Sequence, residues 1–141
     1  MTPSEIALVK ESFRRLVPIG DQVAALFYAR LFDLDPSLRP LVSGDRIGQG
    51  RKLMAILAAA VASLEHLDRI APALRALGAR HANHGLRERH YPTVGVALLW
   101  TLEKCLGSDF TAGIRTAWDK TYALLAHTLA DSNRHVSAAA A

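Results

Sequence analysis

Apolar side chains recur along this chain every three or four residues, the period of an α-helix with one buried face. No segment alternates apolar and polar residues for long enough to indicate a strand. The pattern predicts an all-α fold whose helices begin near Pro3, Asp21, Gln49, Asp68, Pro92 and Asp109. The second helix is expected to bury Leu26, Phe27, Leu31 and Leu34.

Several of these helices carry recognisable end signals. Thr2-Pro3-Ser4-Glu5 has the order of a capping box, with proline at the first helical position. Asp21 and Asp109 are expected to cap helices, and Gly107 is expected to end one. The alanine-rich, largely apolar pattern from about Gln49 to His66 predicts the most buried helix.

The chain has 141 residues, 50% of them hydrophobic, which suits one folded domain and excludes a disordered chain. We expect this domain over residues 1–131, with residues 132–141 as a frayed C-terminal tail. The longest apolar run is shorter than the ~20 residues needed to cross a bilayer. Because the amino terminus also lacks the order of a signal peptide, we expect a soluble cytoplasmic protein without membrane insertion.

The net charge of +4 comes from 17 basic and 13 acidic residues, and the basic residues are scattered, which argues against a nucleic-acid partner. The single cysteine, Cys105, is interpreted as a buried, inert thiol. No nucleotide-binding glycine motif is present, and the length leaves no room for a flavin or nicotinamide domain. Hydrolytic machinery is also missing, since no nucleophile adjoins a base.

His81 is the most informative residue for function. It lies on the same predicted helical stripe as Leu74 and Leu77, and a buried imidazole needs a partner. It is either a satisfied core histidine or a ligand of a metal or haem iron. The nearby His84 and His90 are interpreted as exposed or capping residues. Spacing alone leaves both alternatives for His81 open.

Four further polar residues are candidates for a functional role. Tyr28 lies at the edge of the second helix, and Gln49 opens the alanine-rich helix one turn before Leu53. Tyr91 and Tyr122 complete the set. Each of the four, taken alone, is more typical of packing or of an ordinary helix position than of a functional site.

Six segments, read in order, resemble the globin family: Leu26–Phe32, Asp35–Leu38, Arg51–Met54, Arg80–His81, His90–Gly95 and Ala117–Tyr122. The likeness is greatest to bacterial single-domain globins and to the haem domain of flavohaemoglobins. It covers about residues 4–131 and rests on the order and separation of the segments. The resemblance implies a globin fold, with about six to eight helices packed around a haem pocket.

The resemblance further implies haem b (iron protoporphyrin IX) as the cofactor, with His81 as the proximal iron ligand. Tyr28 and Gln49 match the distal polar positions, whose donors stabilise negative charge on O₂ held at ferrous iron. Because the distal residue is glutamine, the sixth coordination position is expected to be open. Other residues expected to contact the cofactor are Val42, Leu53, Leu57, Tyr91, Val94, Leu98 and Tyr122.

The chain departs from the family at two positions. Tyr91 and Tyr122 match tyrosines of the network around the proximal histidine in flavohaemoglobins, but Asn133 stands where that network has a carboxylate. This change implies weaker peroxidase-like or dioxygenase-like activation. Val42 stands where globins carry a phenylalanine stacked on the haem. Basic residues that could pair with haem propionates, or serve only as surface charge, are Arg51, Lys52 and Arg87.

By resemblance, then, the chain binds O₂ reversibly at ferrous iron, and NO or CO as related gases. One hypothesis is nitric oxide dioxygenation, with Tyr28 and Gln49 as catalytic residues and a separate reductase as the electron source. A second is storage, transport or sensing of a gas without turnover. A third is a haem-free helical interaction domain with His81 in its core.

Overall fold

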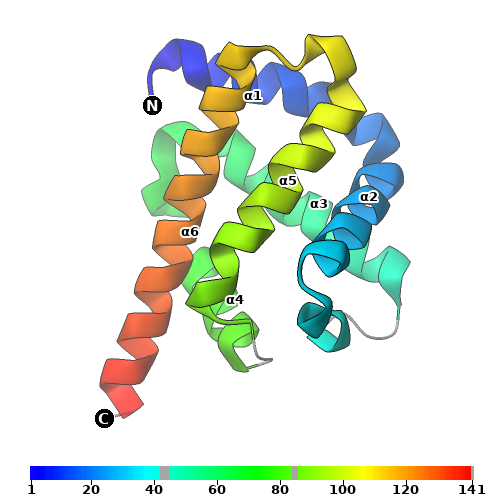
Figure 1. Cartoon of the computed structure of the whole chain (residues 1–141). Coiled ribbons are helices and arrows are strands. Elements are labelled where there is room, and N and C mark those ends of the chain that lie inside the picture. Colours follow the sequence, from blue (N-terminus) through cyan, green and yellow to red (C-terminus); the bar gives the residue numbers. More distant parts are fainter. Residues whose placement is uncertain (42–44, 84–85, 141) are drawn as a thin grey trace.

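The computed structural model describes residues 1–41, 45–83 and 86–140. Over these ranges the chain forms six α-helices and no strand, which confirms the all-α prediction. The α-helices are α1 (Pro3–Leu16), α2 (Gly20–Leu34), α3 (Arg46–Ala62), α4 (Ala71–Asn83), α5 (Tyr91–Leu106) and α6 (Ala112–Ala140) (Figure 1). The 3-10 helices between them are η1 (Val17–Ile19), η2 (Pro36–Leu41), η3 (Leu64–Arg69), η4 (Glu88–His90) and η5 (Gly107–Asp109).

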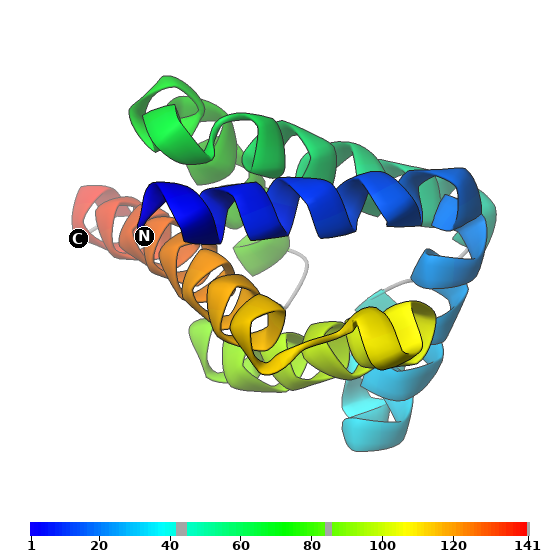
Figure 2. The same cartoon turned by 90° about the horizontal axis from the view of Figure 1, so that it is seen from above.

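Helix α1 begins at the predicted capping box and crosses the molecule between α3 and α6 (Figure 2). The Thr2 hydroxyl accepts a hydrogen bond from the Glu5 N–H at 3.1 Å, and the Glu5 carboxylate accepts one from the Thr2 N–H at 2.9 Å. Lys120 of α6 lies 2.6 Å from the same carboxylate. The hydrogen bond from Lys120, together with those from Thr2, lowers the pKa of Glu5 to about 2. One carboxylate therefore caps α1 and ties it to α6.

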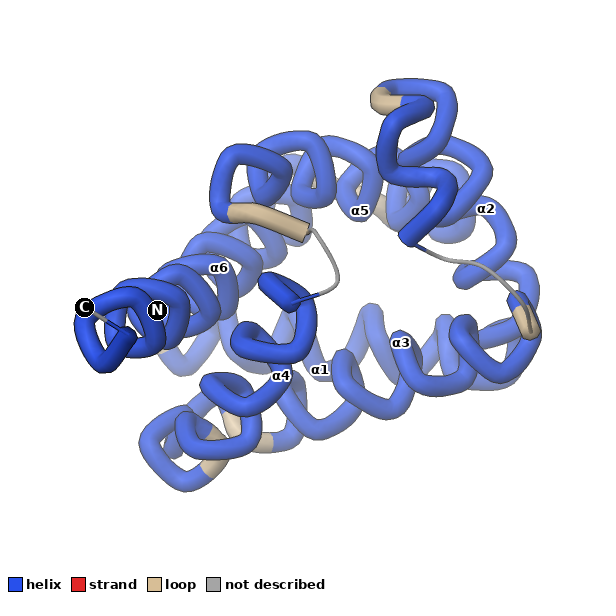
Figure 3. The backbone as a smooth tube through the Cα atoms, turned by 90° about the horizontal axis from the view of Figure 1, so that it is seen from below, coloured by secondary structure: helices blue, strands red, loops and turns tan. Residues whose placement is uncertain are grey.

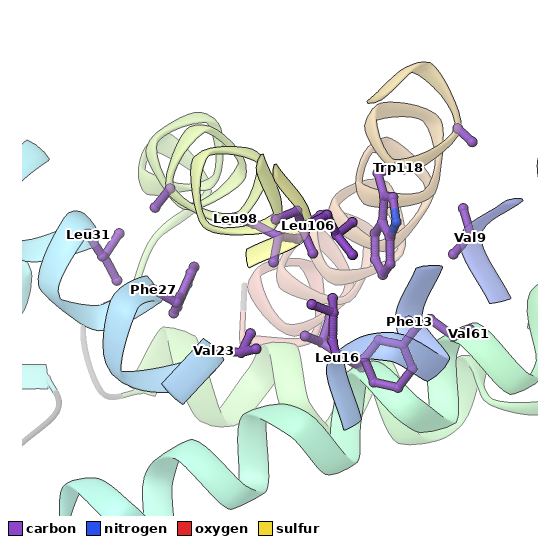
Figure 4. Close-up of a cluster of buried hydrophobic side chains, with 14 of the residues drawn as sticks. Val9, Phe13, Leu16, Val23, Phe27, Leu31, Val61, Leu98, Leu106 and Trp118 are labelled. Atoms are coloured by element: carbon purple, nitrogen blue, oxygen red, sulfur yellow. The ribbon is translucent and has the colours of Figure 1, made fainter. Parts of the chain in front are cut away.

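The main hydrophobic core lies where α1, α2, α5 and α6 meet, with α3 closing one side (Figure 4). Each helix contributes side chains from one stripe, as the spacing predicts. Members of this core include Val9, Phe13, Leu16, Val23, Phe27, Leu31, Val61, Leu98, Leu106 and Trp118. A smaller cluster of Ala60, Leu74 and Leu125 joins α3, α4 and α6.

A buried hydrogen bond connects α1 to α6 inside the main core. The indole N–H of Trp118 donates to the Ser12 hydroxyl oxygen at 2.8 Å, and the Ser12 hydroxyl donates to the Leu8 carbonyl at 2.7 Å. The exposed fractions are 1% for Trp118 and 3% for Ser12. The Ser12 hydroxyl therefore gives the buried indole N–H of Trp118 a hydrogen-bond acceptor, and its own proton is taken by the Leu8 carbonyl.

Several helix ends differ from the sequence prediction, and α4 begins at Ala71 rather than near Asp68. Asp45 caps α3 with its carboxylate, so this helix begins one turn earlier than predicted. Thr111, rather than Asp109, accepts a hydrogen bond in the first turn of α6. Asp21 does not cap α2, because the helix begins at Gly20 with Ile19 as its N-cap residue and Asp21 lies within its first turn. Gly107 does end α5, with a φ of 57° that suits glycine.

The predicted buried face of α2 is partly wrong. Leu26 and Leu34 are 37% and 39% exposed, whereas Val23, Ala24 and Phe32 are buried along with the predicted Phe27 and Leu31. The cause is the two neighbours of α2, since it packs against α5 on one side and α3 on another. A single apolar stripe drawn from spacing does not describe a helix with two packing surfaces.

The prediction that the helix at about residues 49–66 is the most buried one is also wrong. Helix α3 buries four residues, whereas α5 buries seven. The exposed positions of α3 include several alanines: Ala55, Ala58, Ala59 and Ala62. Alanine favours helix at any position, so an alanine-rich pattern does not separate buried from exposed positions.

Helix α6 packs along α4 and α1 and continues to Ala140. Side chains from residue 131 onward, including Asn133, lie outside the described part of the structure. The fraying expected at residues 132–141 and the domain boundary at residue 131 stay predictions.

Candidate functional site

Two close contacts set the crossing of α2 and α3. Gly50 of α3 is buried against Ala24 of α2, and a Cβ built on Gly50 would lie 2.8 Å from the Ala24 Cβ. One turn further along α3, Met54 lies beside Gly20 at the start of α2. These contacts lie where α3 crosses α2. This crossing brings Gln49, the residue before Gly50, next to the middle of α2.

Tyr28 lies in that middle part of α2, with its hydroxyl facing α3. The hydroxyl donates to the backbone carbonyl of Gln49 at 3.4 Å, well beyond the about 2.7–2.8 Å usual between two oxygens. Its ring packs edge-on against Phe27 and stacks with Phe32. Burial raises the pKa of Tyr28, so at neutral pH the hydroxyl keeps its proton. The structure thus brings together two of the residues singled out in the sequence and leaves a weakly engaged donor there.

We expect Gly50→Ala to lower the free energy of unfolding by up to about 2 kcal/mol in a urea titration. The added Cβ overlaps that of Ala24, and overpacking costs about 1–3 kcal/mol, against about 1 kcal/mol that alanine gains over glycine in a helix. Gly20→Ala is the matched control, since its Cβ meets only the flexible Met54 at 3.5 Å. Ala24→Gly should rescue the Gly50→Ala protein. Equal stability of the two single variants would contradict this account of the crossing.

A second polar contact joins α5 and α6. The Tyr122 hydroxyl donates to the backbone carbonyl of Tyr91 at 2.7 Å, a short and therefore strong bond. The Tyr91 side chain is buried and that of Tyr122 is half-buried. Burial, and then the neighbouring Tyr91, raise the pKa of Tyr122. The structure places both of these sequence-selected tyrosines at the first turn of α5.

The predicted apolar lining residues lie on α3 and α5, which occupy opposite sides of the ring of helices seen from below (Figure 3). Leu53, one turn after Gln49, is half-buried, and so is Val94 near the start of α5. Leu57 and Leu98, one turn further along each helix, are buried in the main core. Large apolar side chains at the outer turns are therefore only partly covered by protein.

Two sequence-selected residues fall where the structure gives no side-chain description. His81 belongs to the last turn of α4 by its backbone, and its side chain lies outside the described part. Val42 lies outside the described residues altogether. Among the described side chains, no group of three or more His, Cys, Asp or Glu residues gathers as a metal site. In the same part of the chain, no helix is long and apolar enough to cross a membrane.

Other sequence interpretations change in the structure. The Arg51 Nε lies 3.8 Å from the Asp21 carboxylate, beside a groove of about 450 Å³ between η1, α2 and α3, and its side chain is exposed, as a surface charge would be. His90 is buried at 8% exposure, and its Nδ1 accepts a hydrogen bond from the Arg87 N–H at 2.9 Å. The prediction that His90 caps a helix is confirmed, whereas the alternative that His90 is exposed is wrong.

Sequence reasoning missed two glycines at the site, Gly50 and Gly95. The second lies on α5 under the ring of Tyr122. A glycine within an otherwise continuous helical pattern was the available signal, because glycine lowers helix stability unless packing requires it.

Comparison with known proteins places the chain in context. A family model described as Globin matches residues 25–129, well over half of the chain. A flavohemoprotein of Bordetella parapertussis is 32% identical over 144 residues, covering 100% of this chain and 36% of the relative. A flavohemoprotein of Xylella fastidiosa is 29% identical over 133 residues, covering 92% of this chain and 33% of the relative. The chain spans about a third of the length of these curated relatives.

Solved structures agree with the family model. A bacterial globin of Campylobacter jejuni superposes with a TM-score of 0.88 at 23% identity, covering 96% of this chain and 99% of the other. An engineered carbene transferase from Rhodothermus marinus, described as a candidate nitric oxide dioxygenase, also has a TM-score of 0.88, at 28% identity. That match covers 99% of this chain and 97% of the other. The predicted fold is therefore confirmed, and the chain belongs to the globin family.

Proposed function

We propose that this chain binds haem b between α3 and α5 and binds O₂ reversibly on the α2–α3 side. Family membership supports haem binding. The single observation that carries the gas-binding assignment is the position of the Tyr28 hydroxyl beside Gln49, where a weakly engaged proton donor adjoins a second polar residue. The half-buried Leu53 and Val94 suit the cofactor too, because a flat apolar ring would cover surface that protein leaves partly open.

Haem in this position would supply a ferrous iron with one open coordination position for a diatomic gas. The residues of the chain then act on the gas. Tyr28 would turn its hydroxyl from the distant Gln49 carbonyl toward the gas and donate a hydrogen bond to it. The Gln49 side-chain amide is the second proposed donor. Fixed donors in a dry pocket stabilise developing negative charge more strongly than water does, because they need no reorganisation.

On the opposite side of the haem, we assign the role of iron ligand to His81 of α4. The hydrogen bond from Tyr122 to Tyr91 fixes the start of α5, which follows the segment after α4. Asn133 takes the place of the carboxylate that flavohaemoglobins use to strengthen the proximal histidine. An amide does not withdraw a proton from imidazole, so we expect a more neutral His81 than in those proteins.

The activity we propose for this site is nitric oxide dioxygenation. In this reaction NO, O₂ and one electron combine to give nitrate, and the electron comes from an external reductase. The flavohemoprotein relatives and the structural neighbour described as a candidate nitric oxide dioxygenase support this choice. Both gases are small and apolar, so they suit a pocket lined by leucine and valine side chains. Storage, transport or sensing of a gas is the competing function, with the same pocket and no turnover.

Stopped-flow mixing of the oxygenated protein with NO separates the two functions. With an excess of reductant and O₂, we expect rapid loss of the oxygenated spectrum followed by its return, and nitrate in large excess over protein. A His81→Ala variant is the control, which should lose both haem and nitrate formation. Nitrate limited to one equivalent per chain, with the reductant demonstrably reducing the iron, would contradict catalysis and favour storage or sensing.

A further inference from the structure

Gly95 lies in the interior of α5, one turn after Tyr91, and its missing side chain is filled by another residue. A Cβ built on Gly95 would lie 3.0, 3.1 and 3.4 Å from the Cε2, Cδ2 and Cζ atoms of Tyr122. Carbon atoms in good contact are about 3.5–4.0 Å apart. The ring of Tyr122 therefore rests on the bare backbone of α5, in a space that alanine would close.

The backbone of α5 does not itself require glycine at this position. Among the described residues, positive φ occurs only at Gly107, so Gly95 has a φ that any residue adopts. A glycine inside a helix lowers its stability relative to alanine. Gly95 is also buried, so the side chain at this position must fit against neighbouring residues. The structure explains the glycine by its packing: only a residue without a Cβ leaves room for the ring of Tyr122.

The position of the ring decides where the Tyr122 hydroxyl points. The ring is rigid, so a displacement at Cε2 and Cδ2 carries the hydroxyl with it. That hydroxyl reaches the carbonyl of Tyr91, four residues before Gly95, at 2.7 Å. A hydrogen bond this short is sensitive to a shift of a few tenths of an ångström. One helical turn of α5 thus provides both contacts of Tyr122: Gly95 packs against its ring, and the Tyr91 carbonyl accepts the hydrogen bond from its hydroxyl.

We infer that Gly95 is a positioning residue: it holds the Tyr122 hydroxyl on the Tyr91 carbonyl and thereby fixes the first turn of α5 beside the proximal side of the haem. The inference rests on the proposed function for its effect on the iron, since only haem bound through His81 would sense the start of α5. The packing of Gly95 and Tyr122 holds with or without haem.

Fluorine NMR of the full chain labelled with 3-fluorotyrosine tests the packing independently of haem. The chain has three tyrosines, and each signal is assigned by its Tyr→Phe variant. We expect Gly95→Ala to move the Tyr122 signal and leave the Tyr28 signal in place. Gly113→Ala is the matched control, because its Cβ would make only ordinary contacts at 3.7 and 3.9 Å. An unmoved Tyr122 signal in Gly95→Ala would overturn the inference.

The iron–histidine stretching band of the ferrous, haem-loaded protein tests the positioning role. Gly95→Ala should shift this band in the same direction as Tyr122→Phe, and the double variant should show no further shift, because both changes break the same hydrogen bond. A Gly95→Ala shift that persists in full in the Tyr122→Phe protein would overturn the role. If no iron–histidine band appears even in the unmodified protein, the proposed function fails while the fluorine result stands.

A second variant keeps the inference testable if Gly95→Ala fails to fold. Gly95→Ala combined with Tyr122→Leu removes the ring that meets the new Cβ. We expect this double variant to fold and to be more stable than Gly95→Ala alone. If the double variant is no more stable than Gly95→Ala, glycine is needed at position 95 for another reason, and the inference is wrong.

Discussion

Tyr28→Phe is expected to speed O₂ dissociation about tenfold or more, since a hydrogen bond to a charged partner contributes about 1.5–3 kcal/mol and about 1.4 kcal/mol corresponds to a factor of ten. Phenylalanine keeps the ring between Phe27 and Phe32 and removes only the hydroxyl. The expected change therefore isolates one donor. Flash photolysis or stopped-flow displacement of O₂ by CO measures the dissociation rate directly.

Two controls accompany the Tyr28→Phe measurement. The O₂ association rate should change little, because the donor acts on the gas after it has bound. The free energy of unfolding should also stay close to that of the unmodified protein, since the hydroxyl makes only a 3.4 Å contact with Gln49 in the folded chain. An unchanged O₂ dissociation rate would remove Tyr28 from the mechanism.

Ser12→Ala is expected to lower the free energy of unfolding by about 1–3 kcal/mol, the cost of leaving one buried polar group unpaired. The variant removes the one acceptor that the described residues give to the indole N–H of Trp118, a residue that is 1% exposed. Because the bond joins α1 to α6, the loss should appear in the global unfolding transition. Urea titration followed by circular dichroism measures it.

Thr128→Ala is the matched control for Ser12→Ala. The Thr128 hydroxyl donates to the Leu124 carbonyl in the preceding turn, as the Ser12 hydroxyl does to Leu8, but it accepts no described hydrogen bond. Its loss should change the free energy of unfolding by less than about 0.5 kcal/mol. Equal effects of the two variants would show that the contact with Trp118 contributes nothing beyond the local bond.

Local features of the fold were predictable because neighbours in sequence determine them. The capping box at Thr2–Glu5 and the end of α5 at Gly107 each depend on a few adjacent residues. The buried face of α2 was not, since Leu26 and Leu34 are exposed by the positions of two other helices. The spacing of apolar residues predicts the buried face of a helix only when that helix packs against one neighbouring element.

The residues of the candidate site were also predictable only as far as local sequence determines them. Spacing alone indicated ordinary packing or helix positions for Tyr28, Gln49, Tyr91 and Tyr122, and only the resemblance to globins assigned them to two sides of one pocket. Their pairing in space depends on contacts across 21 and 31 residues of chain. Gly50 and Gly95 were missed because the reason for each glycine lies on another helix, at Ala24 and Tyr122.

Haem titration of the purified chain, followed by absorption spectra of its ferric, ferrous and oxygenated forms, tests the central claim most directly. We predict one haem per chain, an open iron position in the ferrous form, and an O₂ spectrum that reverses when O₂ is removed. His81→Ala should abolish the specific haem spectrum. A chain that stays colourless when supplied with haem would contradict the account and leave a haem-free helical domain.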